Sequence, residues 1–126
     1  MQKQIVSTEK APKAIGPYSQ AQIVGDLIFT SGQIPLNPAT GVLCTEIKEA
    51  TKQSLENVKA ILEAAGTSLD NVIKTVVFIK NMDDFALVNE VYGTYFKTDA
   101  PARSCVQVAK LPMDALIEIE AIATIK

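Results

Sequence analysis

The sequence predicts an α+β fold, a mixed β-sheet with two helices packed on one face. Two long segments carry apolar residues at the spacing of an amphipathic helix, and several shorter runs are rich in the β-branched residues that strands favour. Each helical segment follows a strand-like run and is apolar on one side only, so both can cover the same face of one sheet. With 126 residues, 48% of them hydrophobic, we expect one domain spanning residues 1–126.

The N-terminal third contains a polar arm, a turn, a hairpin and a loop. Gly16–Tyr18 reads Gly-Pro-Tyr, which is typical of a tight turn that presents an aromatic ring. Residues 20–24 and 27–31 are short apolar runs that flank Gly25-Asp26, a two-residue hairpin signal. The segment Pro35–Gly41 then carries two prolines, which exclude a central strand and predict a loop.

The middle of the chain predicts a helix, a strand and a second helix. Glu46–Ala65 has apolar residues near helical spacing and is followed by Gly66, the residue type most often found just past a helix end. Asn71–Lys80 is rich in valine and isoleucine, which indicates a buried strand. The second helix is expected to begin at a cap, Asp83 or Asp84, and its apolar stripe consists of Phe85, Val88, Tyr92, Tyr95 and Phe96.

Two further strand-like runs, Arg103–Lys110 and Ile117–Ile125, follow near the C-terminus. The segment between them is short and contains proline, so the simplest connection is an antiparallel hairpin. Arg103 and Glu118 are then expected to meet across the two strands. A guanidinium beside a carboxylate makes either a structural ion pair or a pocket for a small carboxylate-bearing ligand.

Strand periodicity also assigns these side chains to faces. Arg103, Cys105 and Gln107 share one face of the first strand, and Glu118 and Glu120 share one face of the second. The face with the two glutamates also holds Ile122 and Thr124, which makes it half apolar. Such a face suggests burial against another copy of the chain.

Composition excludes several classes of partner. The net charge is −2, with 12 basic and 14 acidic residues spread along the chain, so no basic footprint for nucleic acid is present. No apolar run approaches the ~20 residues that cross a bilayer, and the chain does not open with a signal-peptide pattern. We therefore expect a cytoplasmic protein with neither nucleic-acid nor membrane partners.

The residue types available also limit the chemistry. The sequence has no histidine and only two cysteines, Cys44 and Cys105, which we expect to be free thiols. Two cysteines do not supply the three or four ligands of a zinc site, so no metal is expected. Any reaction must use carboxylate, thiol, hydroxyl, arginine, lysine or backbone groups.

Five ordered blocks resemble the reactive intermediate deaminase family, also called Rid or YjgF-like. They are AIGPYSQA (14–21), FTSGQIPLNPATG (29–41), QSLENVKAILEAAG (53–66), DDFALVNEVY (83–92) and PARSCVQVAKLP (101–112). The resemblance implies a homotrimer whose sheets form a central barrel, with sites between subunits. It also implies hydrolysis of imine and enamine intermediates to 2-oxo acids and ammonia, the 2-iminobutanoate/2-iminopropanoate deaminase reaction, without a cofactor.

The resemblance also implies residue roles. Arg103 holds the α-carboxylate of the substrate, and Glu118, rather than Glu120, positions the attacking water. The remaining residues expected at the pocket are Tyr18, Ser31, Gly32, Asn89 and Cys105, with Tyr18 reaching the site of a neighbouring subunit. Cys105 contributes mainly its backbone amide.

Without the resemblance, each residue has a simpler interpretation. Arg103 can be a solvated charge at a sheet edge, Glu118 part of an ordinary polar face, Asn89 a tie between helix and sheet, and Cys105 a packing residue or a nucleophile. Two other functions also stay open, a 2-oxo-acid-binding regulatory module without turnover and an endoribonuclease. The acidic charge balance and the absence of histidine argue against the endoribonuclease.

Overall fold

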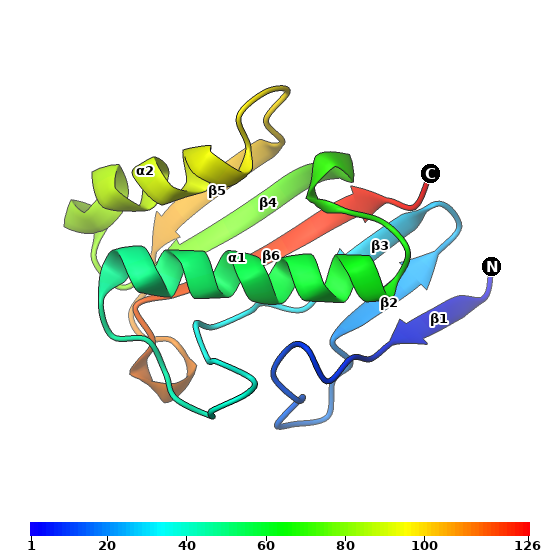
Figure 1. The fold of residues 1–126 in the computed structure, drawn as a ribbon, viewed down its shortest axis with the longest axis horizontal. Helices are drawn as coiled ribbons and strands as arrows, with labels where there is room; N and C mark the ends of the chain where they lie inside the picture. The colour runs from blue at the N-terminus through cyan, green and yellow to red at the C-terminus, as the bar shows by residue number, and fades with distance from the viewer.

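The computed structural model describes residues 1–126 as one mixed sheet covered on one side by two helices (Figure 1). The sheet has six strands in the order β1-β2-β3-β6-β4-β5. The strands are β1 (Lys3–Val6), β2 (Ala21–Val24), β3 (Leu27–Thr30), β4 (Val72–Ile79), β5 (Ala102–Gln107) and β6 (Ile117–Thr124). The helices are α1 (Ile47–Ala64) and α2 (Phe85–Tyr95). The predicted fold class is therefore confirmed.

The predicted hairpin and first helix are confirmed, together with the glycines expected in the turn and after the helix. Gly25 joins β2 to β3 with a φ of 58°, a left-handed conformation that glycine adopts without strain. Glu46 caps α1, because its carboxylate accepts a hydrogen bond of 2.8 Å from the backbone N–H of Glu49. Gly66 follows the helix with a φ of 87°.

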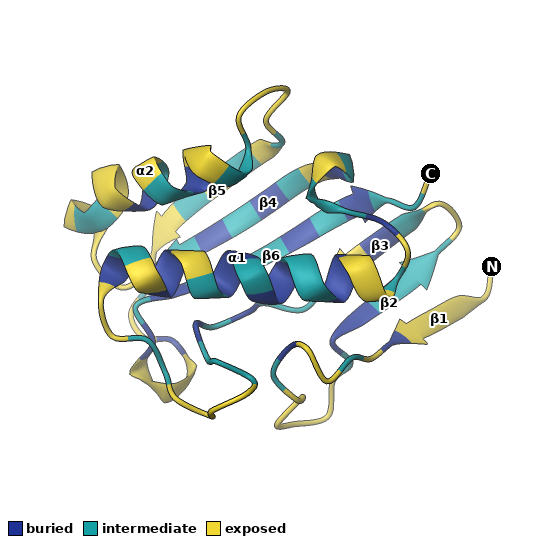
Figure 2. Cartoon of the chain, viewed as in Figure 1, coloured by how far each residue is buried: buried dark blue, intermediate teal, exposed yellow.

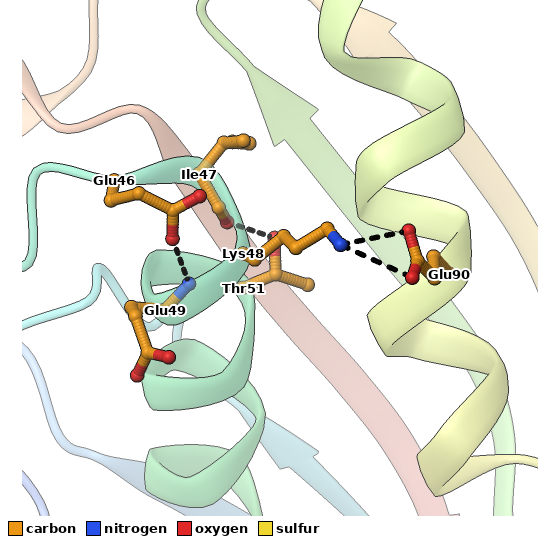
Figure 3. A network of polar contacts seen from close by, with 6 residues as sticks. All are labelled: Glu46, Ile47, Lys48, Glu49, Thr51 and Glu90. Carbon is orange, nitrogen blue, oxygen red and sulfur yellow. Dashed lines mark hydrogen bonds and ion pairs between the residues drawn. The ribbon is translucent and has the colours of Figure 1, made fainter.

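The predicted cap position of α2 is confirmed, but the hydrogen bond expected there is not formed. Asp84 occupies the cap position, but its side chain makes no capping hydrogen bond. Instead, Asn81 accepts a bond of 2.9 Å from the N–H of Asp83 and begins the 3-10 turn that leads into the helix. Farther along, Glu90 of α2 pairs with Lys48 of α1 at 3.1 Å (Figure 3). Both side chains are exposed, so this pair adds little to stability.

The predicted hairpin between the last two strands is wrong. β5 pairs in parallel with β4, and β6 pairs antiparallel with the other edge of β4, so β4 lies between them. Val108 donates to the carbonyl of Ile79 (3.0 Å), while Lys80 donates to that of Leu116 (3.0 Å). The connection therefore passes around the end of β4, and β5 becomes the edge of the sheet.

The first strand was not predicted. β1 adds to the opposite edge by pairing antiparallel with β2. Only Val6 of its four residues is buried, so the strand lacks the alternating apolar pattern by which strands are recognised.

The core lies between the helices and one face of the sheet (Figure 2). Along β6, Ile117, Ile119, Ala121 and Ala123 are buried against the helices and alternate with partly exposed residues, as strand periodicity predicts. The other face of the sheet carries no helix (Figure 1). We call it the open face. No helix is long and apolar enough to span a membrane.

Candidate functional site

Four of the residues predicted for the site gather in one hollow on the open face. A cavity of about 310 Å³ is lined by Tyr18, Ser31, Gly32 and Glu118, together with Ile15, Ile34 and Pro112. We call it the glutamate pocket. Glu118 enters it from β6, and the other residues come from the loops on either side of the β2–β3 hairpin and from the loop before β6.

Hydrogen bonds hold the turn that carries Tyr18 against the end of β3. The hydroxyl of Ser31 donates to the carbonyl of Ser19 at 2.6 Å, and the backbone N–H of Ser31 donates to Gln20 at 2.8 Å. The Tyr18 hydroxyl accepts a bond of 3.3 Å from the backbone of Ile15, and its side chain stays half exposed. Ser31 therefore fixes the turn that presents Tyr18.

Gly32 is the residue against which Glu118 packs. A Cβ atom at Gly32 would lie 2.7 Å from Cδ and 2.8 Å from Cγ of Glu118, closer than such atoms approach. The neighbouring Gln33 exchanges two backbone bonds with Ile119, of 2.8 and 3.1 Å, and so fixes this approach. The close contact that glycine permits here is with the carboxylate-bearing side chain.

Gly32→Ala is expected to lower activity with little loss of stability. The added methyl group displaces the Glu118 side chain, which can swing toward the open pocket without disturbing the core. Turnover and thermal unfolding of the variant test this. Gly93→Ala is the matched control, because a Cβ at that α2 position meets nothing within 4 Å and alanine favours a helix by about 1 kcal/mol. Loss of folding without loss of specific activity would contradict the expectation.

The Glu118 carboxyl is protonated more readily in this pocket than it would be in bulk water. Burial raises the pKa of this carboxyl above its usual range, and the negative charge of Glu120 raises it further. Glu118 accepts no hydrogen bond from Gly32 or Tyr18, its neighbours in the pocket. A carboxylate with a raised pKa and free lone pairs is suited to bind and deprotonate a water molecule.

Arg103, the only arginine of the sequence, lies in a different part of the molecule. Its Nη1 donates to Oδ1 of Asn89 at 2.8 Å. Its guanidinium carbon lies 5.4 Å from the ring centre of Phe85 and 4.8 Å from that of Tyr92, within cation–π range. We call Asn89, Phe85 and Tyr92 the arginine cage. All three belong to one face of α2, at positions four and seven residues apart.

The expected meeting of Arg103 and Glu118 within one chain is wrong. Arg103 pairs with Thr75 of β4, and Thr75 pairs in turn with Ala121 of β6. Thr75 and Ala121 are both buried under the helices. Glu118 lies beside Phe78 on the open face. The two charged side chains therefore leave opposite faces of the sheet. Arg103 also takes part in none of the ion pairs of the chain, which all use lysine.

Cys105 follows Arg103 on the same face of β5, as the alternation predicts. It is a free thiol, as is Cys44. Burial raises the pKa of the Cys105 thiol, and the nearby positive charge of Arg103 lowers it by less. The thiol therefore stays protonated near neutral pH, which disfavours the nucleophile interpretation.

The apolar stripe predicted for α2 included Phe85 and Tyr92, with no connection to Arg103. Tyr92 is buried in the core, as predicted, whereas Phe85 is 38% exposed and lies outside the core, so the prediction was wrong for Phe85. An aromatic residue four before and another three after Asn89 was the available signal, because these positions share a helix face. Ile15, Ile34 and Pro112 carried no such signal.

Comparison with known proteins finds close relatives over nearly the whole chain. The family described as Endoribonuclease L-PSP matches residues 8–125. A RutC family protein of Pyrococcus abyssi is 56% identical over 98% of both chains. The 2-iminobutanoate/2-iminopropanoate deaminase of Escherichia coli K12 is 53% identical over 94% of both.

Solved structures agree with the fold. The crystal structure of E. coli TdcF with bound serine superposes with a TM-score of 0.93 at 51% identity, covering 96% of this chain and 98% of that one.

Proposed function

The chain belongs to the endoribonuclease L-PSP family, also described as the Rid family, and from this we propose that it is an imine deaminase. Its substrates are the reactive enamine and imine intermediates released by pyridoxal-phosphate enzymes: 2-aminoacrylate, 2-iminopropanoate and 2-iminobutanoate. The products are 2-oxo acids and ammonia. It acts in the cytoplasm and needs no cofactor of its own.

The observation that carries the proposal is the state of Arg103. A half-buried guanidinium normally has an acidic partner, but the partners of Arg103 are an amide oxygen and two rings. Nη1 is committed to Asn89, while the rest of its planar fork makes no hydrogen bond to the chain. A positioned fork without a carboxylate of its own is suited to bind the carboxylate of a ligand.

We place the complete site between copies of the chain in a homotrimer whose sheets form a central barrel. Arg103 and Glu118 leave opposite faces of one sheet, so two copies are needed to bring both to one substrate. The open face supports this, since large apolar side chains lie exposed on it, among them Ile5, Phe29 and Val106. Such a surface favours association.

In this cleft, Arg103 of one copy binds the substrate carboxylate, and Glu118 of the next orients water toward the imine carbon. Glu118 accepts a proton from the water as the C–O bond forms, and the imine nitrogen takes up a proton. Protonated Glu118 then gives its proton to the amino group of the resulting carbinolamine, and the C–N bond breaks to release ammonia. The hydroxyl group loses its proton to the solvent that protonated the imine, as the C=O bond of the 2-oxo acid forms. Imines hydrolyse readily in water, so positioning of the reactants suffices.

A trapping assay tests the function directly. A serine or threonine dehydratase reaction is run with semicarbazide, which captures the free imine. Added protein is expected to decrease the trapped imine and to speed release of the 2-oxo acid. The Arg103→Lys variant serves as the control. Equal trapping with and without the wild-type protein would refute the deaminase proposal.

The trimer predicts a solution mass three times the 13.6 kDa of one chain, or 40.8 kDa. Light scattering across micromolar concentrations measures it. Exposed apolar side chains on the open face are the physical reason to expect association. A mass near 13.6 kDa over that range would exclude a site shared between copies.

A 2-oxo-acid-binding module without turnover is the second candidate. It is favoured by the structure of a relative, TdcF, with bound serine, an amino acid that carries the same α-carboxylate. Such a module would bind 2-oxo acids normally and leave the trapping assay unchanged. Glu118 argues for turnover, because a negative charge beside an anionic ligand opposes binding but serves hydrolysis.

A further inference from the structure

A second layer of residues lies behind the arginine cage. The Tyr92 ring faces the guanidinium of Arg103 at 4.8 Å, and the Tyr92 side chain is only 7% exposed. Its hydroxyl lies 2.7 Å from Oγ1 of Thr75, in a buried hydrogen bond between α2 and β4. The ring of Phe96 also packs on that of Tyr92, with ring centres 4.7 Å apart.

The hydrogen bond between Tyr92 and Thr75 lies directly next to Arg103 in the sheet. In the parallel pairing of β4 with β5, Thr75 is the direct neighbour of Arg103, and cross-strand neighbours project their side chains from the same face. The hydrogen bond therefore ties α2 to the sheet at the place where the Arg103 side chain leaves its strand. The Tyr92 ring of α2 is therefore anchored to the sheet next to Arg103.

Arginine needs such support at this position. Its side chain is long and rotatable and starts from an edge strand, so carboxylate binding would otherwise have to order it. Asn89 contacts one nitrogen of the fork, and this single bond does not set the tilt of its plane. A fixed ring with its centre 4.8 Å from the guanidinium carbon adds the second constraint.

We propose that Tyr92, anchored by Thr75, is a positioning residue that fixes the plane of the Arg103 guanidinium for carboxylate binding. The inference rests on the proposed role of Arg103 in binding the substrate carboxylate. Tyr92 itself does not touch the substrate, because its hydroxyl is committed to Thr75 and its ring is buried.

Tyr92→Leu is expected to raise KM for the imine, and Kd for a 2-oxo acid, by about tenfold, the scale of one cation–π contact. Its kcat should change by less than about threefold, because Glu118 and its water are not disturbed. Tyr92→Phe keeps the ring and loses only the anchor, so its KM is expected to rise by about threefold, less than in Tyr92→Leu, the scale of one lost hydrogen bond. Thr75→Val should match Tyr92→Phe, and Thr75→Ser should behave as the wild type.

Tyr95→Leu is the matched control. Tyr95 is an aromatic residue of the same helix, but its hydroxyl bonds to Glu56 of α1 at 2.7 Å rather than to the sheet. Its loss removes a ring and a phenolic hydrogen bond without touching the arginine cage. We expect an unchanged KM for this variant, with thermal unfolding measured for every protein to compare their stability.

A double-mutant cycle separates positioning from general support of the fold. If Tyr92 acts through Arg103, adding Tyr92→Leu to Arg103→Lys should change kcat/KM by less than about twofold. An equal loss in both backgrounds, or an equal rise of KM in Tyr95→Leu, would show a purely structural role and overturn the inference. So would an unchanged KM in Tyr92→Leu. If Tyr92→Leu does not fold, the KM values of Thr75→Val and Tyr92→Phe test the positioning role instead. A wild-type KM in both variants would overturn the inference.

The same set of variants distinguishes failure of the inference from failure of the proposed function. If Arg103→Lys lowers activity while Tyr92→Leu does not, only the positioning role is lost. If Arg103→Lys leaves both KM for the imine and Kd for the 2-oxo acid unchanged, Arg103 does not bind the carboxylate. The proposed function and this inference are then both refuted.

Discussion

Arg103→Lys is expected to lower kcat/KM for imine hydrolysis by about a hundredfold, equivalent to ~2.7 kcal/mol of lost transition-state binding. Lysine keeps the positive charge but loses the planar fork that binds a carboxylate through two parallel bonds. It also changes the cation–π contacts with the rings of Phe85 and Tyr92. Binding of 2-oxo acids, measured by calorimetry, should weaken together with turnover. A Kd within about threefold of the wild type would contradict the role of Arg103.

Chemical modification offers an independent test, because Arg103 is the only arginine of the chain. An arginine-selective dicarbonyl such as phenylglyoxal is expected to inactivate the wild-type protein with one modified side chain per chain. A 2-oxo acid should protect against it. The Arg103→Lys variant is the matched control and should incorporate no reagent. Protection without any effect of modification on activity would indicate that Arg103 lies near the ligand but does not bind it.

Glu118→Gln is expected to cut kcat by about 10² to 10⁴, the usual contribution of a general base. Glutamine keeps the size of the side chain but does not accept a proton from water. Binding of 2-oxo acids should stay the same or become tighter, because a negative charge near the anionic ligand is gone. Calorimetry and single-turnover kinetics measure the two effects separately.

Glu120→Gln is the matched control for Glu118→Gln. Glu120 shares the open face two residues farther along β6 but does not line the glutamate pocket. Its substitution should change kcat by less than about threefold. Unchanged turnover in Glu118→Gln would refute the water-positioning role, whereas loss of 2-oxo-acid binding would show that the carboxylate supports the ligand site itself.

The pH dependence of activity provides a further check on Glu118. Its role requires the ionised form, so activity should fall as the pH is lowered through its pKa. Burial and the charge of Glu120 raise that pKa, which places the acidic limb of kcat/KM above the value of about 4.3 for an ordinary glutamate. The limb should be absent from the residual activity of Glu118→Gln. An acidic limb at the same pH in that variant would assign the titration to another group.

The sequence by itself determined two helices, five of the six strands, their faces and the residue types of the site, because these depend on local periodicity. Alternation along β6 was sufficient to separate Glu118 and Glu120 from the buried residues. Helical spacing and caps were sufficient for α1. β1 was not predicted, because an edge strand with one buried residue has no periodic pattern of apolar residues.

Only the tertiary structure decided the strand order and, with it, how the site is divided. A hairpin and a connection around β4 have the same local pattern, and they differ in whether β5 and β6 pair with each other or both pair with β4, as they do here. The turn before β6 also contains two residues with positive φ, Met113 (57°) and Asp114 (55°), conformations that these residue types seldom adopt and that no local signal predicts. Inserting β6 between β3 and β4 places Arg103 and Glu118 on opposite faces. Side-chain alternation is a property of each strand alone, whereas the distance between two charged groups depends on pairing between segments far apart in the chain.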